Sequence, residues 1–265
     1  DDSANSCDDA WDACVDSIID TEYLASLVGR LKWFSEKDYF VSKQGMSFDV
    51  MGLLAKSISN TIFALVGRTK KCLVLDLDNT LWGGVIGDDD LDGINLDPND
   101  AVGEAYLSFQ KYAKLLKERG VLLAVCSKNE KEIAKLPFQK HPNMILKLDD
   151  IGCFVANWQD KPNNLKEIAH SLNIGLDSIV FFDDNPVERE IVSETLPEVS
   201  VVNVPEDPAY FVRALELEMH FDWVQLSIED INRSSSIISN IKRKSLEKVS
   251  HNYDDYFILI NFQFN

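Results

Sequence analysis

The chain has 265 residues, of which 45% are apolar, and carries a formal net charge of −18. A chain of this length can bury a stable core without disulfides or metal ions, and its acidic balance excludes a generally basic surface for nucleic acid. Because it contains no run of eighteen apolar residues, we expect that no segment spans a membrane. The five cysteines lack zinc-finger spacing and are odd in number, which favours a reducing, cytoplasmic location over a disulfide framework.

Composition and periodicity divide the chain into four predicted parts. Residues 1–20 hold seven aspartates and no basic residue, which indicates an acidic leader or linker. Apolar residues recur at helical spacing across residues 21–68, so we expect a helical N-terminal extension that covers one face of the core. Residues 69–222 alternate strand and helix patterns and form the predicted catalytic core. Residues 223–265 are expected to be a tail of helix and strand packed on that core.

The core contains five short apolar runs that predict buried strands. They occupy residues 72–75, 120–125, 144–148, 178–182 and 199–204. Strands that alternate with helices imply a Rossmann-like α/β fold, in which a parallel sheet is connected by right-handed crossovers and covered by helices on both faces. The clearest predicted helix starts near Asp100 and stops at Gly120, with Val102, Tyr106 and Phe109 in its buried stripe.

Two aspartates spaced by one residue end the first predicted strand. Asp76 and Asp78 belong to a D-x-D-x-T sequence and would leave the sheet where an open α/β fold places its ligand crevice. Neighbouring carboxylates repel each other unless a cation or a proton lies between them. Carboxylate, water and phosphate oxygens are the ligands that Mg²⁺ prefers, so this pair predicts a phosphate-handling site. The alternative is that the two side chains only cap the following turn.

Other predicted strand ends and one loop supply more polar groups. Cys126, Ser127, Lys128 and Asn129 follow the second strand, and Asp183 with Asp184 follows the fourth. Lys161 lies between these segments and directly precedes a helical pattern. Hydroxyl, amide and ammonium groups suit phosphate oxygens, so Ser127, Lys128, Asn129 and Lys161 are predicted phosphate ligands. A lysine is also needed to reduce repulsion among four aspartates in one crevice.

The order of these segments (aspartates, small hydroxyl, lysine, aspartates) resembles the four motifs of the haloacid dehalogenase superfamily. The resemblance implies strand order 5-4-1-2-3, and residues 88–98 are too short for more than a minimal cap. It also implies that Mg²⁺ is held by Asp76, Asp183 and Asp184 together with the backbone carbonyl of Asp78. Asp76 would then attack phosphorus, and the side chain of Asp78 would serve as general acid or base.

Four longer sequence segments narrow the resemblance to the FkbH-like family, which extends over about residues 45–222. They are LDLDNTLWGGVIGDD at residues 75–89, LLAVCSKNE at 122–130, NWQDKPNNL at 157–165 and FFDDNPVERE at 181–190. Members of that family load a glyceryl unit from 1,3-bisphosphoglycerate onto an acyl carrier protein during polyketide biosynthesis. The likeness implies the same activity here, or transfer of a related lactyl-type unit, with associated Mg²⁺-dependent dephosphorylation. It also implies a phosphopantetheine-bearing carrier as partner, and that the chain can be a domain of a larger polyketide synthase.

In the family's scheme the acyl group is carried as a thioester on the residue matching Cys126. Without the motif, a cysteine that ends an apolar strand is usually a small buried hydrophobe. A nucleophilic thiol needs local positive charge, which Mg²⁺, Lys128 and Lys161 can supply while the aspartates oppose it. Trp82 and Gly83 adjoin the first motif and are predicted to contact substrate, although a core tryptophan would show the same pattern.

Three functions therefore compete at the level of sequence. The first is the acyltransferase that works through Cys126. The second is a Mg²⁺-dependent phosphatase that uses Asp76 as its nucleophile and leaves Cys126 incidental. The third is a noncatalytic docking domain, which the complete set of motifs disfavours.

Overall fold

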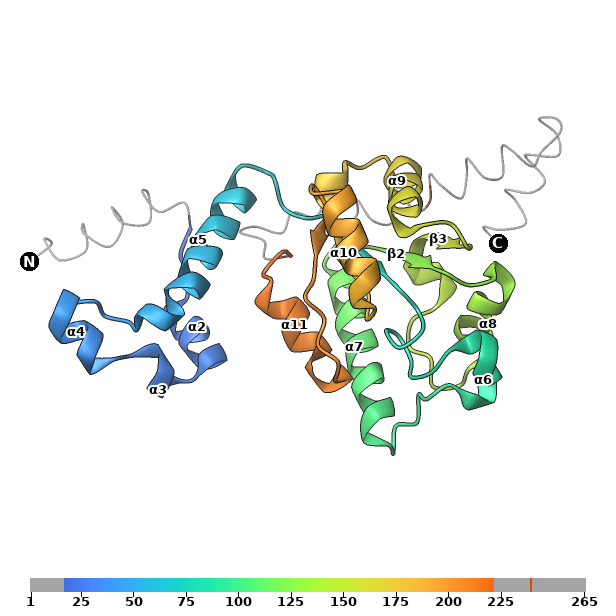
Figure 1. The fold of residues 1–265 in the computed structure, drawn as a ribbon, viewed down its shortest axis with the longest axis horizontal. Helices are drawn as coiled ribbons and strands as arrows, with labels where there is room; N and C mark the ends of the chain where they lie inside the picture. Colours follow the sequence, from blue (N-terminus) through green and yellow to red (C-terminus); the bar gives the residue numbers. More distant parts are fainter. Residues whose placement is uncertain (1–16, 222–238, 240–265) are drawn as a thin grey trace, which may run out of the picture. The chain divides into compact units, whose positions relative to one another are not determined.

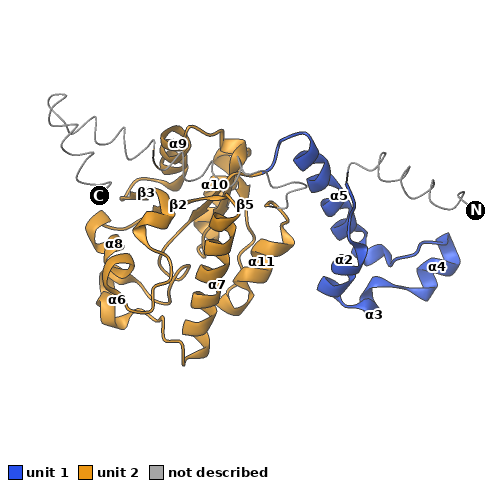
Figure 2. Cartoon of the chain, turned by 180° about the vertical axis from the view of Figure 1, so that it is seen from behind, with its two compact units in different colours: residues 1–69, 222–225 blue, residues 70–221, 226–265 orange. Residues whose placement is uncertain are grey.

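A computed structural model of the chain describes residues 17–221 and residue 239. The described residues fall into two compact units, one within residues 17–69 and one within residues 70–221 (Figure 2). The predicted acidic leader and C-terminal tail lie outside the described residues, apart from residues 17–20 and 239. The four-part division of the chain stays a prediction.

The larger unit contains a five-stranded parallel sheet (Figure 1). Its strands are β1 (Cys72–Leu75), β2 (Leu122–Ser127), β3 (Ile151–Ala156), β4 (Ile179–Phe182) and β5 (Ser200–Val201). They lie in the order β3-β2-β1-β4-β5, which is the predicted order read from the other edge. The parallel α/β fold with helices on both faces is confirmed. β1, whose residues are completely buried, lies at the centre of the sheet.

One predicted strand was wrong. Residues 144–148 form a loop, and the third strand is β3 instead. Met144 and Leu146 are buried in the core, which explains the apolar pattern. The backbone N–H groups of Ile145 and Leu146 donate to the side-chain oxygen of Gln110, at 2.9 and 3.3 Å, rather than to a neighbouring strand. Side-chain burial in this loop therefore imitates a strand without joining the sheet.

Helices cover both faces of the sheet (Figure 1). α7 (Ala101–Glu118) and α11 (Phe211–Leu217) pack on one face, and α9 (Lys161–Leu172) and α10 (Pro186–Thr195) pack on the other. α8 (Lys131–Lys140) packs beside β3. The described residues also form four short 3₁₀ helices, which are Phe48–Val50, Leu148–Asp150, Leu176–Ser178 and Pro208–Tyr210.

The long helix α7 confirms the segment predicted between Asp100 and Gly120. The Asp100 side chain accepts the N–H of Gly103 and caps its first turn, and Gly120 follows its end with a φ of 99°. Tyr106 and Phe109 are buried as predicted, whereas Val102 is exposed because it lies on the outer side of the first turn. Only the short helix α6 (Ile86–Gly93) separates β1 from α7, so the cap is minimal.

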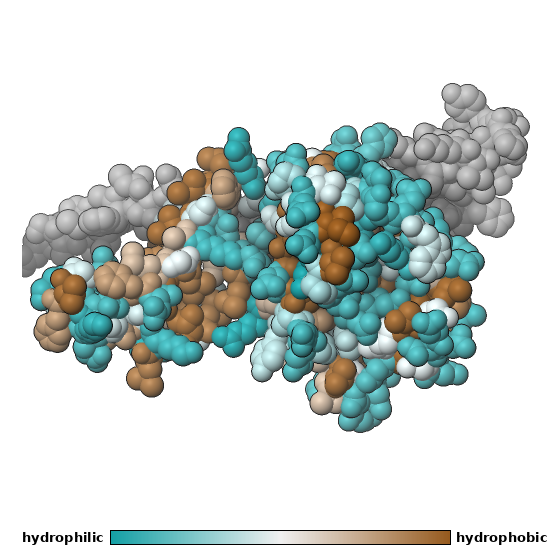
Figure 3. Space-filling view, in the orientation of Figure 1, coloured by the Kyte–Doolittle hydropathy of each residue, from teal (hydrophilic) through white to brown (hydrophobic). Residues whose placement is uncertain are grey.

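The smaller unit consists of short helices and one longer one. They are α2 (Thr21–Val28), α3 (Arg30–Trp33), α4 (Glu36–Ser42) and α5 (Met51–Leu65). Its buried apolar residues within 17–69 are Leu24, Ala25 and Val50. Many other apolar residues of this unit are exposed, and Figure 3 shows hydrophobic residues in brown on its surface. That this region covers a face of the catalytic core stays a prediction.

Among the described residues, one helical stretch, Phe48–Leu65, is long and apolar enough to cross a membrane by length and composition alone. The sequence contains no uninterrupted apolar run there, because Asp49 and Lys56 lie within it. The stretch is apolar enough only when its hydropathy is averaged over its whole length. That no segment spans a membrane stays a prediction.

We predict that Gln110→Leu destabilises the protein strongly. The Gln110 amide is fully buried and also donates to the carbonyl of Leu81 at 2.7 Å, so leucine would leave one carbonyl and two N–H groups without their partner. Each buried group left unpaired costs about 1–3 kcal/mol. Urea unfolding should show this loss for Gln110→Leu, whereas Gln159→Leu, at an exposed position, should stay within about 0.5 kcal/mol of the parent. Equal stability of the two variants would contradict the bridging role.

Candidate active site

The register of the three central strands brings the first polar residues of the site together. Leu75 of β1 pairs with Val125 of β2 and with Phe182 of β4. The next residue of each strand is therefore level with the others, and these residues are Asp76, Cys126 and Asp183. Side chains alternate along a strand, so all three turn to the face covered by α9 and α10.

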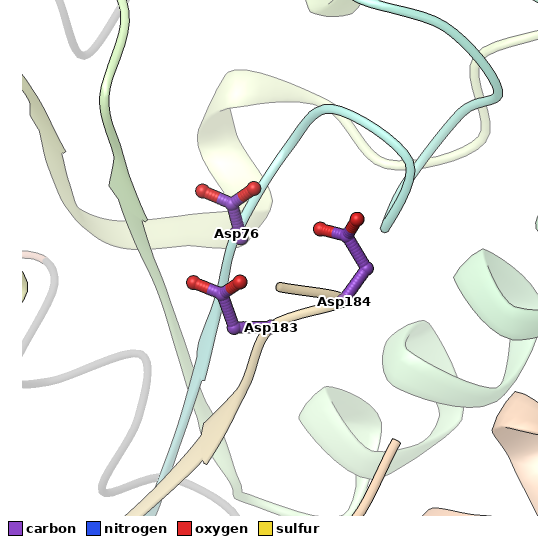
Figure 4. Close-up of side chains that lie close together, drawn as sticks. All are labelled: Asp76, Asp183 and Asp184. Carbon is purple, nitrogen blue, oxygen red and sulfur yellow. The ribbon is translucent and has the colours of Figure 1, made fainter. Parts of the chain in front are cut away.

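Asp76, Asp183 and Asp184 form an acidic group that can hold a metal ion. One carboxylate oxygen from each lies within 4.8 Å of the others, and Figure 4 shows the three side chains around a common space. Oδ2 of Asp183 is buried and has no hydrogen-bond donor among the described residues, although the Lys161 ammonium is 3.0 Å away. A carboxylate oxygen left in this way is a suitable ligand for a hard cation.

Lys161 lies at the centre of this group and is almost completely buried. It is the first residue of α9, because Asp160 caps the helix and Pro162 occupies its first turn. Its ammonium group donates to Asp76 Oδ1 and to the carbonyl of Cys126, and pairs with Asp183. Two of its three N–H bonds are therefore used in hydrogen bonds, and the contact with Asp183 is an ion pair. In this arrangement Lys161 holds the carboxylates together, and its predicted contact with phosphate stays a prediction.

Burial controls the protonation of the acidic group. Burial alone would lower the pKa of Lys161, but the charges of Asp76 and Asp183 outweigh it and raise that pKa, so Lys161 stays charged. Burial raises the pKa of Asp76 to about 7, with Lys161 opposing the shift and Asp183 adding to it. Burial and the charge of Asp183 raise the pKa of Asp184 to about 6. Burial and the neighbouring carboxylates therefore both favour the protonated forms of Asp76 and Asp184, and a bound cation would favour the ionised forms.

A pocket opens above this group. Its walls are formed by Asp76, Asp78, Asn79, Ser127, Lys128, Lys161, Asp183, Asp184, Asn185 and Glu188. Five of these side chains are carboxylates and two are ammonium groups, a formal charge of −3. An added cation would therefore favour the binding of an anionic substrate in this pocket.

Asp78 lies on the pocket wall but is held differently from Asp76. Its Oδ1 accepts the indole N–H of Trp82 at 2.9 Å and the backbone N–H of Ile86 at 3.0 Å. Its Oδ2 accepts the amide N–H of Asn129 at 2.7 Å. The Asp78 side chain is outside the metal-binding group, and its role as acid or base stays a prediction.

Ser127 and Lys128 lie on the pocket wall, and their binding of phosphate stays a prediction. Ser127 Oγ accepts a bond from Asn129 at 3.2 Å, so its own hydrogen can point into the pocket. Lys128 pairs with Glu188 at the pocket mouth. Asn129 does not line the pocket but contacts two residues that do, Asp78 and Ser127.

The structure does not bring Trp82, Gly83 or Cys126 to the pocket wall. Trp82 is completely buried, and its ring meets that of Phe138 edge to face. Gly83 forms a backbone bridge with Asn95 and packs against the Tyr106 ring. The Cys126 side chain is completely buried, and burial raises the pKa of its thiol to about 12. In this conformation the thiol is neutral and inaccessible.

Sequence reasoning missed three residues that support the site. Arg189 Nη1 donates to the carbonyls of Asp183 and Asp184, both at 2.7 Å, and fixes the turn that carries them. Thr80, from the D-x-D-x-T sequence, contacts Asp184. Glu188 pairs with Lys128. Each lies within a motif already quoted, but spacing alone does not show which loop its side chain will meet.

Comparison with known proteins shows similarity to a solved structure. No family model and no curated protein matches the chain. A solved structure, the N-terminal part of the protein BF1531 from Bacteroides fragilis containing a phosphatase domain complexed with Mg, is 43% identical with a TM-score of 0.75. The match covers 77% of this chain and 54% of that one, so the chain spans about half the length of its neighbour.

The strand order, the minimal cap and this neighbour establish a Rossmann-like haloacid dehalogenase fold. The narrower resemblance to the FkbH-like family stays a prediction.

We predict that Lys161→Met lowers the free energy of unfolding by about 3–5 kcal/mol, the usual cost of leaving a buried charge without its partner. Burial raises the pKa of Asp76 to about 7 even with Lys161 present, so the loss should grow as the pH rises through this value and shrink as the pH falls and the carboxylates are protonated. Chemical unfolding at several pH values would measure this.

The matched control is Lys166→Met, which removes an exposed lysine from the same helix. It should unfold like the parent at each pH. If Lys161→Met unfolded like this control, the ammonium group would not be what holds the carboxylates together.

Proposed function

We propose that this chain is a Mg²⁺-dependent phosphoryl-transfer enzyme that hydrolyses phosphate monoesters or acyl phosphates through Asp76. The observation that carries the proposal is the group of Asp76, Asp183 and Asp184 around a buried lysine at the base of an open pocket. The phosphatase domain of the structural neighbour, which is complexed with Mg, supports it.

The three carboxylates would hold the magnesium ion. Their oxygens are the hard ligands that Mg²⁺ prefers, and the buried Asp183 Oδ2 is an oxygen without a hydrogen-bond donor among the described residues. When bound, the ion would offset the negative charge of the pocket and of the phosphate group.

Asp76 would act as nucleophile and Asp78 as proton carrier. Lys161 binds Oδ1 of Asp76, so Oδ2 is the oxygen that is free to attack phosphorus. As the new P–O bond forms, the bond to the leaving group breaks, and protonated Asp78 gives its proton to the departing oxygen. In the second step Asp78 takes a proton from water, which attacks phosphorus and releases phosphate from Asp76. Ser127 and Lys128 would hold phosphate oxygens.

The test is phosphate release from p-nitrophenyl phosphate and from an alkyl phosphate. The parent should release phosphate with Mg²⁺ and stop when EDTA is added. Asp76→Asn should lose at least about 1000-fold in rate, because it removes the nucleophile. Asp183→Asn should need more Mg²⁺, since it removes one charged ligand. Asp92→Asn, at an exposed position outside the acidic group, is the control. Full activity of Asp76→Asn, or activity indifferent to EDTA, would rule the mechanism out.

We also propose the finer function that the four sequence segments imply, which is acyl transfer through Cys126. The Cys126 thiolate would attack the carbonyl carbon of an acyl phosphate, phosphate would leave, and the thioester would pass to the phosphopantetheine thiol of an acyl carrier protein. The favourable observation is that Cys126 is level with Asp76 and its carbonyl binds Lys161. The buried thiol must first be uncovered, so this function needs a local opening at the end of β2.

Intact-protein mass spectrometry after incubation with an acyl phosphate would test acyl transfer. The parent should gain the mass of the acyl group, and Cys126→Ala should not, while keeping its Mg²⁺-dependent phosphate release from p-nitrophenyl phosphate. Cys153→Ala removes another free thiol, in β3, and should behave like the parent. An adduct on Cys126→Ala at the parent rate, or none on the parent, would reject the thioester and leave the phosphatase proposal standing.

A further inference from the structure

We infer that Trp82 and Asn129 are positioning residues that clamp Asp78 for proton transfer and leave Oδ2 of Asp78 as the oxygen that exchanges the proton. The inference rests on the proposed phosphoryl-transfer function. It assigns two residues predicted to touch substrate to a different task, which is to orient a residue that does.

The clamp grips both oxygens of the carboxylate. Oδ1 accepts two N–H groups, from Trp82 and Ile86, and Oδ2 accepts one, from Asn129. The terminal torsion of an aspartate is normally broad, so a bond on each oxygen removes a rotation that would otherwise be free. A carboxylate has about four acceptor positions, and three are used here. Because Oδ1 holds two of the donors, the remaining position belongs to Oδ2.

Each donor is itself fixed by its surroundings. Trp82 is completely buried, and its ring lies edge to face with Phe138 of α8, with ring centroids 6.0 Å apart. The indole N–H of a buried tryptophan needs an acceptor, and here that acceptor is a carboxylate on the pocket wall. The nitrogen of the Asn129 amide faces Asp78 and donates to its Oδ2 at 2.7 Å. The same nitrogen donates to Ser127 Oγ, which connects the donors around Asp78 to a predicted phosphate ligand.

The donors come from two directions along the chain. Trp82 belongs to the connection between β1 and α6, Ile86 is the first residue of α6, and Asn129 follows β2. Asp78 is thus fixed between the minimal cap and the sheet. A small shift of either part would misalign a proton donor, and misplacement of a catalytic group by about 1 Å can cost roughly 100-fold in rate.

The decisive variant is Trp82→Phe, which removes the N–H but keeps an aromatic ring against Phe138. Asn129→Ala removes the N–H donor to Oδ2 of Asp78, and it is the variant to test if Trp82→Phe does not fold. Trp158→Phe makes the same chemical change at a tryptophan that is 76% exposed, and is the control. Thermal unfolding and Mg²⁺ titration first establish that each variant is folded and binds the ion like the parent.

Leaving-group dependence then separates orientation from simple structural damage. Departure of an alkoxide needs a proton, whereas p-nitrophenolate leaves without one. In Trp82→Phe, single-turnover phosphoryl transfer from an alkyl phosphate should slow by roughly 10- to 100-fold, and transfer from p-nitrophenyl phosphate should not. Turnover of p-nitrophenyl phosphate should show a burst of nitrophenol, because the later attack by water also needs Asp78. KM should be unchanged.

Two outcomes would overturn the inference while leaving the proposed function in place. In the first, Trp82→Phe and Asn129→Ala turn over both substrates like the parent. In the second, both substrates slow equally and no burst appears, which indicates a structural effect. If the parent itself releases no phosphate with Mg²⁺, the proposed function fails and the inference falls with it.

Discussion

A single ammonium group, on Lys161, meets two buried carboxylates at the ends of neighbouring strands, and the rest of the site depends on this contact. Asp76 and Asp183 could not stay side by side and ionised in the core without it. Yet a cation is unfavourable in the first turn of a helix, where Lys161 lies. Lys161 is nevertheless stable there, because three oxygen-bearing groups at the ends of β1, β2 and β4 surround its ammonium group. They are the carboxylates of Asp76 and Asp183 and the carbonyl of Cys126.

Asp76 and Asp78 show how one strand end assigns different tasks to two like residues. Asp76 turns toward α9, where Lys161 and the other carboxylates lie, and burial raises its pKa. Asp78, two residues later, has left the strand and is held by N–H donors from the β1–α6 connection, from the start of α6 and from the segment that follows β2. The first environment suits metal binding and attack on phosphorus. The second suits a fixed proton carrier.

Fold and function separate at Cys126. A haloacid dehalogenase fold supports several chemistries, so the fold does not decide whether the thiol takes part. The thiol is level with Asp76 but turned into the core beneath Lys161. Phosphate chemistry needs only the pocket as it stands. Thioester chemistry additionally needs the end of β2 to open, so the two proposals differ in a physical requirement.

The sequence by itself determined most of the sheet and the set of polar residues at its edge. Apolar runs and the aspartates that follow them are local signals, and they indicated β1, β2, β4, β5 and α7. It mistook residues 144–148 for a strand, because a buried loop and a strand share the same apolar pattern. Only the tertiary structure decided that Trp82 and Asn129 bind Asp78, that Lys161 bridges Asp76, Asp183 and the carbonyl of Cys126, and that Cys126 is buried. These contacts join residues far apart in the chain, or depend on side-chain direction, and neither is recorded in spacing.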